Sequence, residues 1–449
     1  MLTTKIAKFG GTSMADAAAI NKTAAIINGD PSRRIVVVSA PGKRNSGDEK
    51  ITDLLYKCNA QAGTPACAET FAVIAGRFRE IVRDLALDLD IDKYLDKAYA
   101  DISSFAGADY AASRGEYLSA LIMAARLKVE FLDAAEIIKF KQDGAFDAEY
   151  TNDLARARLA GIIRGAVVPG FYGSLPDGSI KTFSRGGSDI TGSIIARAAG
   201  AGVYENWTDV NGFLTCDPRI VKNPRQIEEL TYRELRELSY MGAAVLHPDS
   251  IFPVRVENIP INIKNTFNPA HKGTMIVPRH GLKSTRAVTG IAGKKGFVSV
   301  FIEKSMMNNE IGFARRVLSV MEHHGVSIEH MPTGIDTLSL VIEEKYLEPK
   351  KLQAVLDDIK AAVAPDQLDV MRDIALIATV GHGMAKRKGT ASRLFAALAK
   401  DDINVVMIDQ GSSELNIIVG VTSADFEKAI NAIYGEFFVN TPAQRELAK

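Results

Sequence analysis

The sequence predicts an α/β protein with a mostly parallel sheet sandwiched by helices, followed by two copies of a small ferredoxin-like βαββαβ module. Over the first ~290 residues, short β-branched runs alternate with helix-length stretches, a pattern typical of parallel sheets. Beyond them the chain repeats itself. Gly312 and Val317 correspond to Gly389 and Leu394 at one offset of 77 residues. Each copy reads strand, glycine turn, helix, two strands and a further helix, which indicates a duplicated βαββαβ unit.

The strands and helices of the first part can be placed in order. Five extended runs are predicted as strands: Thr4–Ala7, Ile35–Ser39, Ala166–Phe171, Val203–Trp207 and Ile259–Lys264. Helical patterns cover Met14–Ile20, Ile51–Cys58, Ala66–Leu85, Tyr110–Arg126 and Ile190–Ala199, and the polar stretch Lys43–Lys50 is predicted to be exposed. Ligands in parallel α/β sheets bind at the carboxyl ends of the strands. We therefore expect the corners after Ala7, Ser39, Phe183 and Trp207 to carry the function.

The Gly- and charge-rich stretch His271–Thr289 has weak periodicity and separates the two parts. It suggests domains at 1–285, 295–370 and 371–449. A strand exchange or insertion between the two repeat copies would blur the boundary near Ile374. A duplicated module that only makes a dimer is the alternative to a regulatory one.

Composition narrows the class of protein. The 449 residues contain 54 Lys and Arg against 54 Asp and Glu, so no basic excess attracts nucleic acid or an anionic membrane. No apolar run approaches the ~18 residues of a membrane span, and no secretory signal is visible. Three cysteines without a CxxC pattern fit a reducing, cytoplasmic location.

The segment Lys8-Phe9-Gly10-Gly11-Thr12-Ser13 follows the first strand. Glycines let backbone N–H groups approach a phosphate closely, and the start of a following helix adds partial positive charge. Lys8 adds a full charge on a flexible stem. The sequence predicts an anion-binding corner here, although an ordinary tight turn has the same glycine pair.

A complementary corner is Ser184-Arg185-Gly186-Gly187-Ser188-Asp189, again where a helix begins. The planar guanidinium of Arg185 suits a carboxylate or phosphate, and Asp189 can orient a lysine. A capped helix with a surface ion pair is the alternative interpretation.

Three further segments are candidates. Trp207 to Gly212, with Asp217-Pro218-Arg219 behind it, suits the base and ribose of a nucleotide, or forms an Asx-type turn. Ser113-Arg114-Gly115-Glu116 and the pair Thr52-Asp53 lie at predicted helix starts, where capping is the alternative role. GxxxxGK[ST], GxGxxG after the first strand, HRD, DFG, GxSxG and zinc-ligand spacings are all absent from the sequence.

Together these motifs resemble the aspartate kinase family. The resemblance is carried by KFGGTS, SRGE, RGGSD, WTDVNG with TCDPR, and MGAAVLHP from Met241 to Pro248, and the tandem repeat is similar to paired ACT domains. The match covers essentially the whole chain in the same order. Acetylglutamate, glutamate 5-, carbamate and UMP kinases share the fold but resemble this motif set less and lack the ACT pair.

The resemblance implies phosphorylation of the β-carboxylate of L-aspartate by ATP with Mg²⁺, the first step towards lysine, threonine and methionine. It implies that Lys8 and Asp189 are catalytic. The implied ATP-binding residues are Lys8, Gly10, Gly11, Ser13, Thr208, Asp209, Leu214 and Arg219. The implied aspartate-binding residues are Ser39, Thr52, Glu116 (for the ammonium), Arg185 (for the α-carboxylate), Gly186, Gly187 and Ser188. No protein ligand to the metal is assigned.

The resemblance also implies allosteric feedback by an amino acid bound to the ACT domains, with lysine the first expectation and threonine the second. The implied regulatory residues are Met307, Asn308, Asn309, Glu310, Phe313, Ala314 and Glu329. The absence of a dehydrogenase extension after Lys449 resembles monofunctional members, and a homodimer through the ACT domains, or a tetramer, is expected. One departure is Ala244, where many members carry Lys.

Two other functions are compatible with the residues. One is another acylphosphate-forming amino acid kinase of the same fold, because glutamate differs from aspartate by one methylene. The other is a catalytically silent amino acid sensor, which the presence of Lys8, Arg185 and Asp189 together disfavours.

Overall fold

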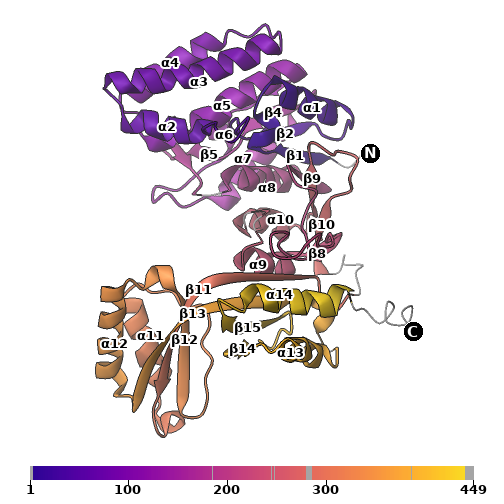
Figure 1. The fold of residues 1–449 in the computed structure, drawn as a ribbon. Coiled ribbons are helices and arrows are strands. Elements are labelled where there is room, and N and C mark those ends of the chain that lie inside the picture. Colours follow the sequence, from indigo (N-terminus) through magenta and orange to yellow (C-terminus); the bar gives the residue numbers. More distant parts are fainter. Residues whose placement is uncertain are drawn as a thin grey trace, which may run out of the picture. The chain divides into compact units, whose positions relative to one another are not determined.

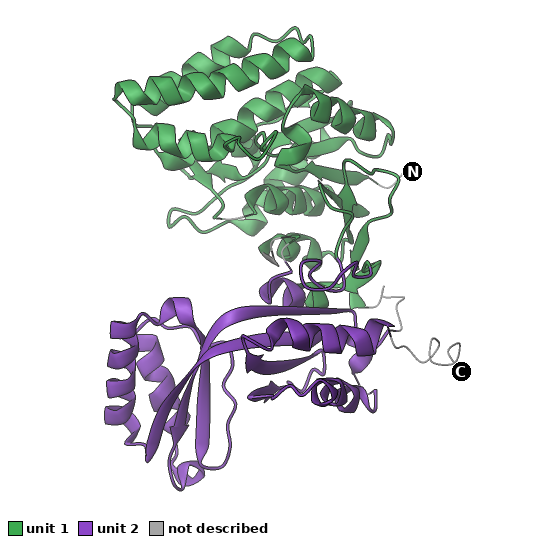
Figure 2. Cartoon of the chain, in the orientation of Figure 1, with its two compact units in different colours: residues 1–213, 226–235, 244–283 green, residues 214–225, 236–243, 284–449 purple. Residues whose placement is uncertain are grey.

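The computed structural model describes residues 4–184, 186–243, 245–246, 248–279, 286–385 and 387–439 (Figure 1). By its internal contacts the chain forms two compact units, shown in different colours in Figure 2. Unit 1 comprises residues 1–213, 226–235 and 244–283, and unit 2 comprises residues 214–225, 236–243 and 284–449.

Unit 1 is built on an eight-stranded sheet with the order β3-β4-β2-β1-β7-β9-β10-β8. These strands are β1 (Lys5–Phe9), β2 (Ile35–Val38), β3 (Glu130–Phe131), β4 (Ala166–Pro169), β7 (Val203–Thr208), β8 (Glu229–Thr231), β9 (Ile261–Asn265) and β10 (Thr274–Val277). Only the β9–β10 pair among them is antiparallel, so the predicted mostly parallel sheet is confirmed. A separate hairpin joins β5 (Tyr172–Ser174) to β6 (Ile180–Thr182).

The predicted helices of unit 1 are present, with small changes in their bounds. The unit contains α1 (Ala17–Asn28), α2 (Ile51–Ala60), α3 (Pro65–Asp84), α4 (Ile91–Ser103), α5 (Ala108–Leu127), α6 (Ala134–Ile137), α7 (Ala148–Ala160), α8 (Gly187–Ala198) and α10 (Ile251–Val256). Helix α9 (Tyr232–Tyr240) crosses from unit 1 into unit 2. Apolar side chains from β1, β2 and α1 to α5 form the main core of this unit. Helix α5 is buried along most of its length, as expected for a helix covered by neighbours on several sides.

The helix predicted from Met14 to Ile20 begins later than expected. Residues Gly11–Met14 form a short 3₁₀ turn, and α1 starts at Ala17 with Asp16 as its N-cap, whose carboxylate accepts from the Ala19 N–H at 2.8 Å. The cap explains the difference, because an acidic N-cap satisfies the first free N–H groups of the helix. The free N–H groups beside the glycine pair therefore come from the 3₁₀ turn and not from α1.

Unit 2 contains a five-stranded antiparallel sheet with the order β12-β11-β13-β15-β14. Its strands are β11 (Gly290–Glu303), β12 (Thr337–Glu343), β13 (Gln367–Val380), β14 (Met407–Asp409) and β15 (Asn416–Thr422), and its main helices are α11 (Phe313–His323), α12 (Pro349–Val363), α13 (Thr390–Lys400) and α14 (Phe426–Tyr434). The predicted internal repeat is visible here. Gly312 and Gly389 are the N-caps of α11 and α13 with φ of 80° and 85°, a region that favours glycine.

The two repeat copies share their long strands. The first half of β11, from Gly290 to Lys295, pairs with Ala375–Val380 of β13, whereas its second half pairs with both β12 and the start of β13. One continuous sheet therefore runs through both copies.

Residues 214–225 belong to unit 2 and contribute side chains to its core, although the sequence places them in the first part of the chain. Cys216 and Val221 belong to the same apolar cluster as Ile291 and Ile377. The Ile291 N–H donates to the Thr215 carbonyl at 2.8 Å, and the Arg225 N–H donates to the Tyr434 hydroxyl at 3.0 Å. The domain limits of 1–285, 295–370 and 371–449 stay a prediction. They do not include the passage of residues 214–225 into unit 2.

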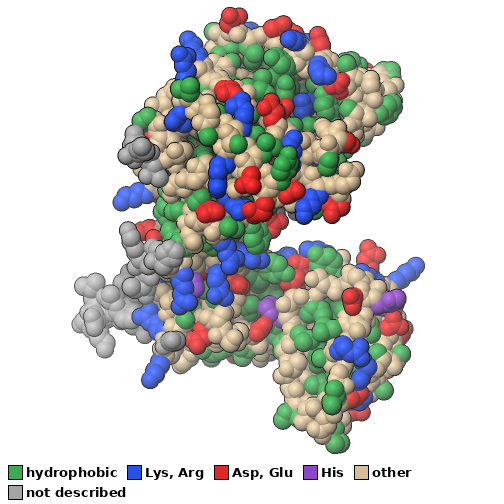
Figure 3. All heavy atoms as spheres, turned by 180° about the vertical axis from the view of Figure 1, so that it is seen from behind, with side chains coloured by type: hydrophobic (Ala, Val, Ile, Leu, Met, Phe, Trp, Pro, Cys, Tyr) green, Lys and Arg blue, Asp and Glu red, His purple; other side chains and the backbone are tan. Residues whose placement is uncertain are grey.

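The surface carries both signs of charge in mixed order on the face shown in Figure 3, in keeping with the equal numbers of basic and acidic residues. Along the described part of the chain, no helix is long and apolar enough to cross a membrane.

Candidate functional site

The candidate site of unit 1 lies at the carboxyl ends of β1, β2 and β7, where three loops approach one another. The Gly10 N–H donates to the Trp207 carbonyl at 3.0 Å, which ties the end of β1 to the end of β7. The Gly42 N–H donates to the Gly11 carbonyl at 2.8 Å, which ties the loop after β2 to the glycine pair. A Cβ on Gly42 would lie 2.7 Å from the Gly11 carbonyl carbon, so the two backbones pack closer than a side chain permits.

Lys8 projects from β1 towards the start of α8. Its Nζ lies 2.6 Å from Oδ1 of Asp189, in the first turn of α8, and the Lys8 side chain is 9% exposed. The Asn206 amide donates to the same Asp189 oxygen at 2.8 Å. A nearly buried ammonium thus faces a carboxylate at the meeting point of the two glycine loops.

The α8 end of the site is open to an anion. Gly186 is the N-cap with φ of 60°, and no side chain of the described residues caps the helix. Gly187 has no room for a side chain, because a Cβ there would lie 2.4 Å from the Phe171 ring. The first N–H groups of an uncapped helix attract negative charge. Arg185, predicted to contact the substrate, lies outside the described residues, as does Ala244.

Glu116 is a buried carboxylate on α5 close to this corner. It is 5% exposed, and its Oε2 has no hydrogen-bond partner among the described residues. Burial raises the pKa of Glu116 to about 8, while hydrogen bonds from backbone groups, including Ala40, and the charge of Lys8 act in the opposite direction. The cause lies in packing: Gly115 brings α5 so close to the loop after β2 that a Cβ at position 115 would be 2.7 Å from the Ala40 Cβ.

Ser39 and Thr52 border the same region. Ser39 directly follows β2, its N–H donates to the Phe9 carbonyl at 3.1 Å, and it is half-buried. Thr52 is half-buried in the first turn of α2, where Lys50 and not Thr52 is the N-cap. The structure therefore brings Lys8, Ser39, Glu116 and Asp189 around one corner of the sheet.

Ser13, another predicted site residue, is fully buried. Its Oγ lies 2.8 Å from the Thr266 hydroxyl, and the Thr23 hydroxyl donates to the Ser13 carbonyl at 3.0 Å. In the described geometry this side chain fixes the loop after β1, and a direct phosphate contact from its hydroxyl stays a prediction.

The predicted nucleotide residues fall in both units. Thr208 ends β7 half-buried, and its hydroxyl bonds to the exposed Asp209 carboxylate at 3.2 Å. Leu214 and Arg219 belong to unit 2. Arg219 is 87% exposed at its side chain and pairs with Asp217 at 2.6 Å. The assignment of these residues to ATP stays a prediction.

The predicted regulatory segment of unit 2 has well-defined partners. Phe313 and Met307 are buried in the core of the first repeat copy, whereas Asn308 and Asn309 are exposed and Ala314 is half-buried. Glu310 pairs with Lys304 at 2.7 Å and also with Arg316, and these cations lower its pKa.

The other predicted regulatory carboxylate, Glu329, accepts a hydrogen bond from the Tyr240 hydroxyl at 2.6 Å. The next residue, His330, contacts Asp409 of β14 with 2.5 Å between Nδ1 and Oδ2. These two contacts join the segment after α11 to α9 and to the second repeat copy.

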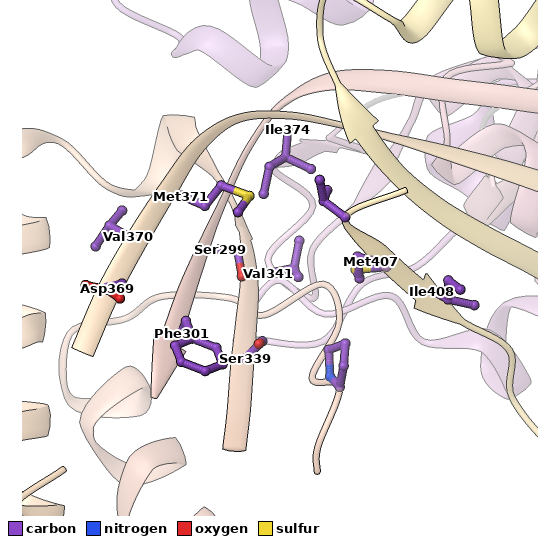
Figure 4. Close-up of a pocket in the computed structure, with 12 residues that line it drawn as sticks. Ser299, Phe301, Ser339, Val341, Asp369, Val370, Met371, Ile374, Met407 and Ile408 are labelled. Carbon is purple, nitrogen blue, oxygen red and sulfur yellow. The ribbon is translucent and has the colours of Figure 1, made fainter. Parts of the chain in front are cut away.

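A cavity of about 630 Å³ lies on one face of the unit 2 sheet (Figure 4). Alternate residues of β11 and β12 line it, namely Ser299, Phe301, Ser339 and Val341, while the residues between them face the core. Asp369 is the charged residue in its lining, which is completed by Pro332, Val370, Met371, Ile374, Val406, Met407 and Ile408. No sequence motif marks these residues, because they come from four strands.

The sequence interpretation also missed Asn206 and Thr266, which hold Asp189 and Ser13. Asn206 follows another polar residue, Glu205, in a buried strand, and this polarity was the available signal. In the part of the chain that the structure describes, no three His, Cys, Asp or Glu side chains gather as a metal site.

Comparison with known proteins is consistent with this geometry. The amino acid kinase family model matches residues 3–265, and an ACT domain model matches residues 377–437. The chain is 38% identical to aspartokinase 3 of Bacillus subtilis (strain 168), over 97% of this chain and 98% of that protein.

Solved structures agree in fold. The aspartate kinase of Clostridium acetobutylicum is 50% identical with a TM-score of 0.89, covering 97% of this chain and 100% of that one. Aspartokinase III of E. coli has been solved with aspartate and ADP (R-state; 25% identical, TM-score 0.76, covering 97% and 100%). The same enzyme has been solved with lysine and aspartate (T-state; 26% identical, TM-score 0.74, covering 97% and 99%).

Proposed function

Because this chain belongs to the aspartokinase family of amino acid kinases and is an aspartate kinase, we propose that it transfers the γ-phosphoryl group of ATP to the β-carboxylate of L-aspartate. The products are ADP and 4-phospho-L-aspartate, an intermediate on the way to lysine, threonine and methionine. The observation that carries the proposal is the Lys8–Asp189 pair, at 2.6 Å, between two glycine loops and beside the buried Glu116.

The chemistry needs charge neutralisation more than proton transfer. A β-carboxylate with a pKa of about 4 is ionised at neutral pH, so its oxygen can attack the γ-phosphorus without a general base. The bond from that phosphorus to the β–γ bridging oxygen breaks, and ADP leaves with the electron pair. Two anions must approach for this to happen, and catalysis consists mainly of positioning and charge stabilisation. Lys8 and the free N–H groups at the start of α8 supply positive charge at the right corner.

Aspartate binding follows from the arrangement around Glu116. We propose that the unpartnered Oε2 of Glu116 accepts the substrate ammonium, with Ser39 and Thr52 lining the pocket. Arg185 and the N–H groups of Gly186 to Ser188 would hold the α-carboxylate. A group whose burial disfavours its charge is well suited to bind an opposite charge, because the ligand restores what solvent no longer provides.

ATP binding is assigned to the glycine loop and to the end of β7. Gly10 and Gly11 would frame the phosphates next to Lys8, with Ser13 fixing the loop, while Thr208, Asp209, Leu214 and Arg219 would contact the nucleotide. Mg²⁺ usually keeps several waters and binds through substrate phosphates, which fits a described site without a cluster of protein ligands. Bound in this way, Mg²⁺ would neutralise phosphate charge.

Hydroxamate trapping of the acylphosphate tests the activity directly. With ATP, Mg²⁺ and hydroxylamine, we expect L-aspartate to give the hydroxamate, with kcat/KM for L-glutamate about 10–200-fold lower because of one extra methylene. A protein that produced no hydroxamate from any amino acid would match the silent-sensor alternative. Preference for another amino acid would indicate a different acylphosphate-forming kinase.

Feedback by lysine is the finer proposal for unit 2, with threonine second. It is supported by the ACT match and by the E. coli relative, which was solved with lysine. We expect millimolar L-lysine to inhibit turnover and Glu329→Ala to relieve the inhibition at least tenfold, because Glu329 is the carboxylate proposed for the ligand ammonium. Glu322→Ala removes an exposed carboxylate of α11 in the same unit and is the matched control. Activity indifferent to both lysine and threonine would contradict the proposal.

A homodimer through unit 2, or a tetramer, is proposed for assembly. Its support is the sheet face around the cavity, where Met371 and Ile408 are 51% and 54% exposed, as expected of apolar side chains that a second copy covers. Sedimentation at several protein concentrations measures the assembly.

A further inference from the structure

We propose that Asn206 is a positioning residue of the phosphoryl-transfer reaction, holding the Asp189 carboxylate in place when Lys8 turns towards the transferring phosphoryl group. The inference rests on the proposed function of Lys8. It concerns a residue that lies just before the WTDVNG segment and belongs to none of the motifs that mark the site.

Asn206 and Lys8 lie side by side on neighbouring parallel strands. In the register of β1 and β7, Lys8 is the partner of Asn206, and both side chains reach the same Asp189 oxygen. The Lys8 Nζ lies 2.6 Å from Oδ1, and the Asn206 Nδ2 lies 2.8 Å from it. Asn206 is 3% exposed, so little water is available to replace it.

The amide of Asn206 can face Asp189 only through its NH₂ group, because an ionised carboxylate accepts hydrogen bonds and cannot donate one. The same nitrogen lies 3.4 Å from the Tyr204 hydroxyl, two residues earlier on the same face of β7. The Tyr204 hydroxyl in turn donates to the Asp189 carbonyl at 3.0 Å. Strand β7 therefore contacts Asp189 twice, through Tyr204 at its backbone carbonyl and through Asn206 at its side chain.

The close approach of β7 to α8 depends on a glycine. A Cβ on Gly192 would lie 2.5 Å from the Tyr204 hydroxyl oxygen. Gly192, one turn after Asp189, lets Tyr204 reach the helix. The contact between Tyr204 and α8 joins β7 to the helix and does not involve Lys8.

A neutral donor suits this position. When Lys8 directs its N–H groups at phosphoryl oxygens, Asp189, whose side chain is 16% exposed, loses its cation. The Asn206 donor then keeps the carboxylate oriented, because its hydrogen bond to Asp189 does not involve Lys8. A second cation at position 206 would compete with Lys8 for Asp189 and for the phosphoryl charge.

Asn206→Leu is the first test, because it keeps the volume and removes the donor. We expect kcat to fall about 10–100-fold, by analogy with the loss of a residue that orients a metal ligand, with both KM values within about threefold. Lys8 and Tyr204, which also contact Asp189, are unchanged in the variant.

Asn206→Asp provides a second, independent readout. At neutral pH the new carboxylate repels Asp189, whereas its protonated form at lower pH can donate in place of the amide. The variant should therefore reach its highest activity at a lower pH than the wild-type enzyme. Asn152→Leu, the same replacement at a buried asparagine of α7, is the matched control and should leave kcat and the pH profile unchanged.

Wild-type kcat in folded Asn206→Leu would overturn the role of Asn206. If that variant does not fold, Asn206→Ser, which is too short to reach Asp189, carries the same expectation and the same contrary result. Wild-type protein without aspartate kinase activity would contradict the proposed function itself. An active wild-type enzyme with unaffected position-206 variants contradicts this inference alone.

Discussion

Replacing Lys8 with Met is expected to lower kcat by about 10²–10³-fold while the KM for aspartate changes by less than about threefold. Lys8 is the buried cation of the described site nearest to Asp189, and removing one preorganised donor to developing charge typically has an effect of this size. Methionine keeps the length and apolar volume of the side chain, so the loss concerns charge and not packing.

Steady-state kinetics of hydroxamate formation, with ATP and aspartate varied separately, measures the effect. Lys5→Met is the matched control, because Lys5 lies on the same strand but pairs with Asp30 at 2.7 Å, at the opposite end of β1. Lys5→Met should retain kcat within about twofold. A folded Lys8→Met enzyme with near-normal kcat would remove Lys8 from the reaction.

Replacing Glu116 with Gln is expected to raise the KM for aspartate by about 10–150-fold and to leave the KM for ATP nearly unchanged. A buried charge-assisted hydrogen bond to an ammonium is worth roughly 1.5–3 kcal/mol, and the amide of Gln presents N–H donors where the ammonium needs an acceptor. Glu69→Gln, on the exposed face of α3, is the control for the same chemical change. An unchanged KM for aspartate would exclude Glu116 from substrate binding.

The same substitution should make the empty protein more stable at alkaline pH. The folded pKa of Glu116 is about 8, above its ordinary value of 4.5, so between these values the folded state keeps a proton that the unfolded state has lost. This contribution to stability therefore falls as pH rises from 4.5 to 8 and is fully lost above 8. We expect the Tm of Glu116→Gln minus the Tm of the wild type to increase between pH 5 and pH 8.5. Thermal denaturation of both proteins without ligand measures this difference.

Aspartate binding should then be coupled to proton release. At pH 7 the empty site holds Glu116 mostly protonated, whereas an ammonium ligand favours the carboxylate. Calorimetric titration in two buffers of different ionisation enthalpy measures the released proton. A binding enthalpy that does not depend on the buffer at pH 7 would contradict the protonated resting state.

Local sequence patterns predicted the elements that local chemistry determines. The β-branched run at Ile35, the glycine-punctuated helix starts and the 77-residue repeat gave the fold class, which the structure and the family matches confirm. Lys8 and Asp189 were recognisable because each lies beside a glycine pair. The structure brings them to 2.6 Å, although 180 residues separate them.

Other features depend on contacts that no local pattern encodes. Helix α1 starts later than the sequence predicted because Asp16 caps it. The burial of Glu116 follows from the close packing of Gly115 against Ala40. The cavity of unit 2 combines alternate residues of separate strands. Asn206 shares its strand with a second buried polar residue, Glu205, and its role depends on the register between β1 and β7.

The chain passes from one unit to the other several times, and this has a consequence for making hybrid enzymes. The chain changes unit after residues 213, 225, 235, 243 and 283, and the segment 214–225 contributes Cys216 and Val221 to the core of unit 2. A chimera joined once, near residue 284, would combine one parent's core-filling segments with the other parent's sheet. To exchange the effector response between relatives, a hybrid should therefore take residues 214–225 and 236–243 from the same parent as residues 284–449.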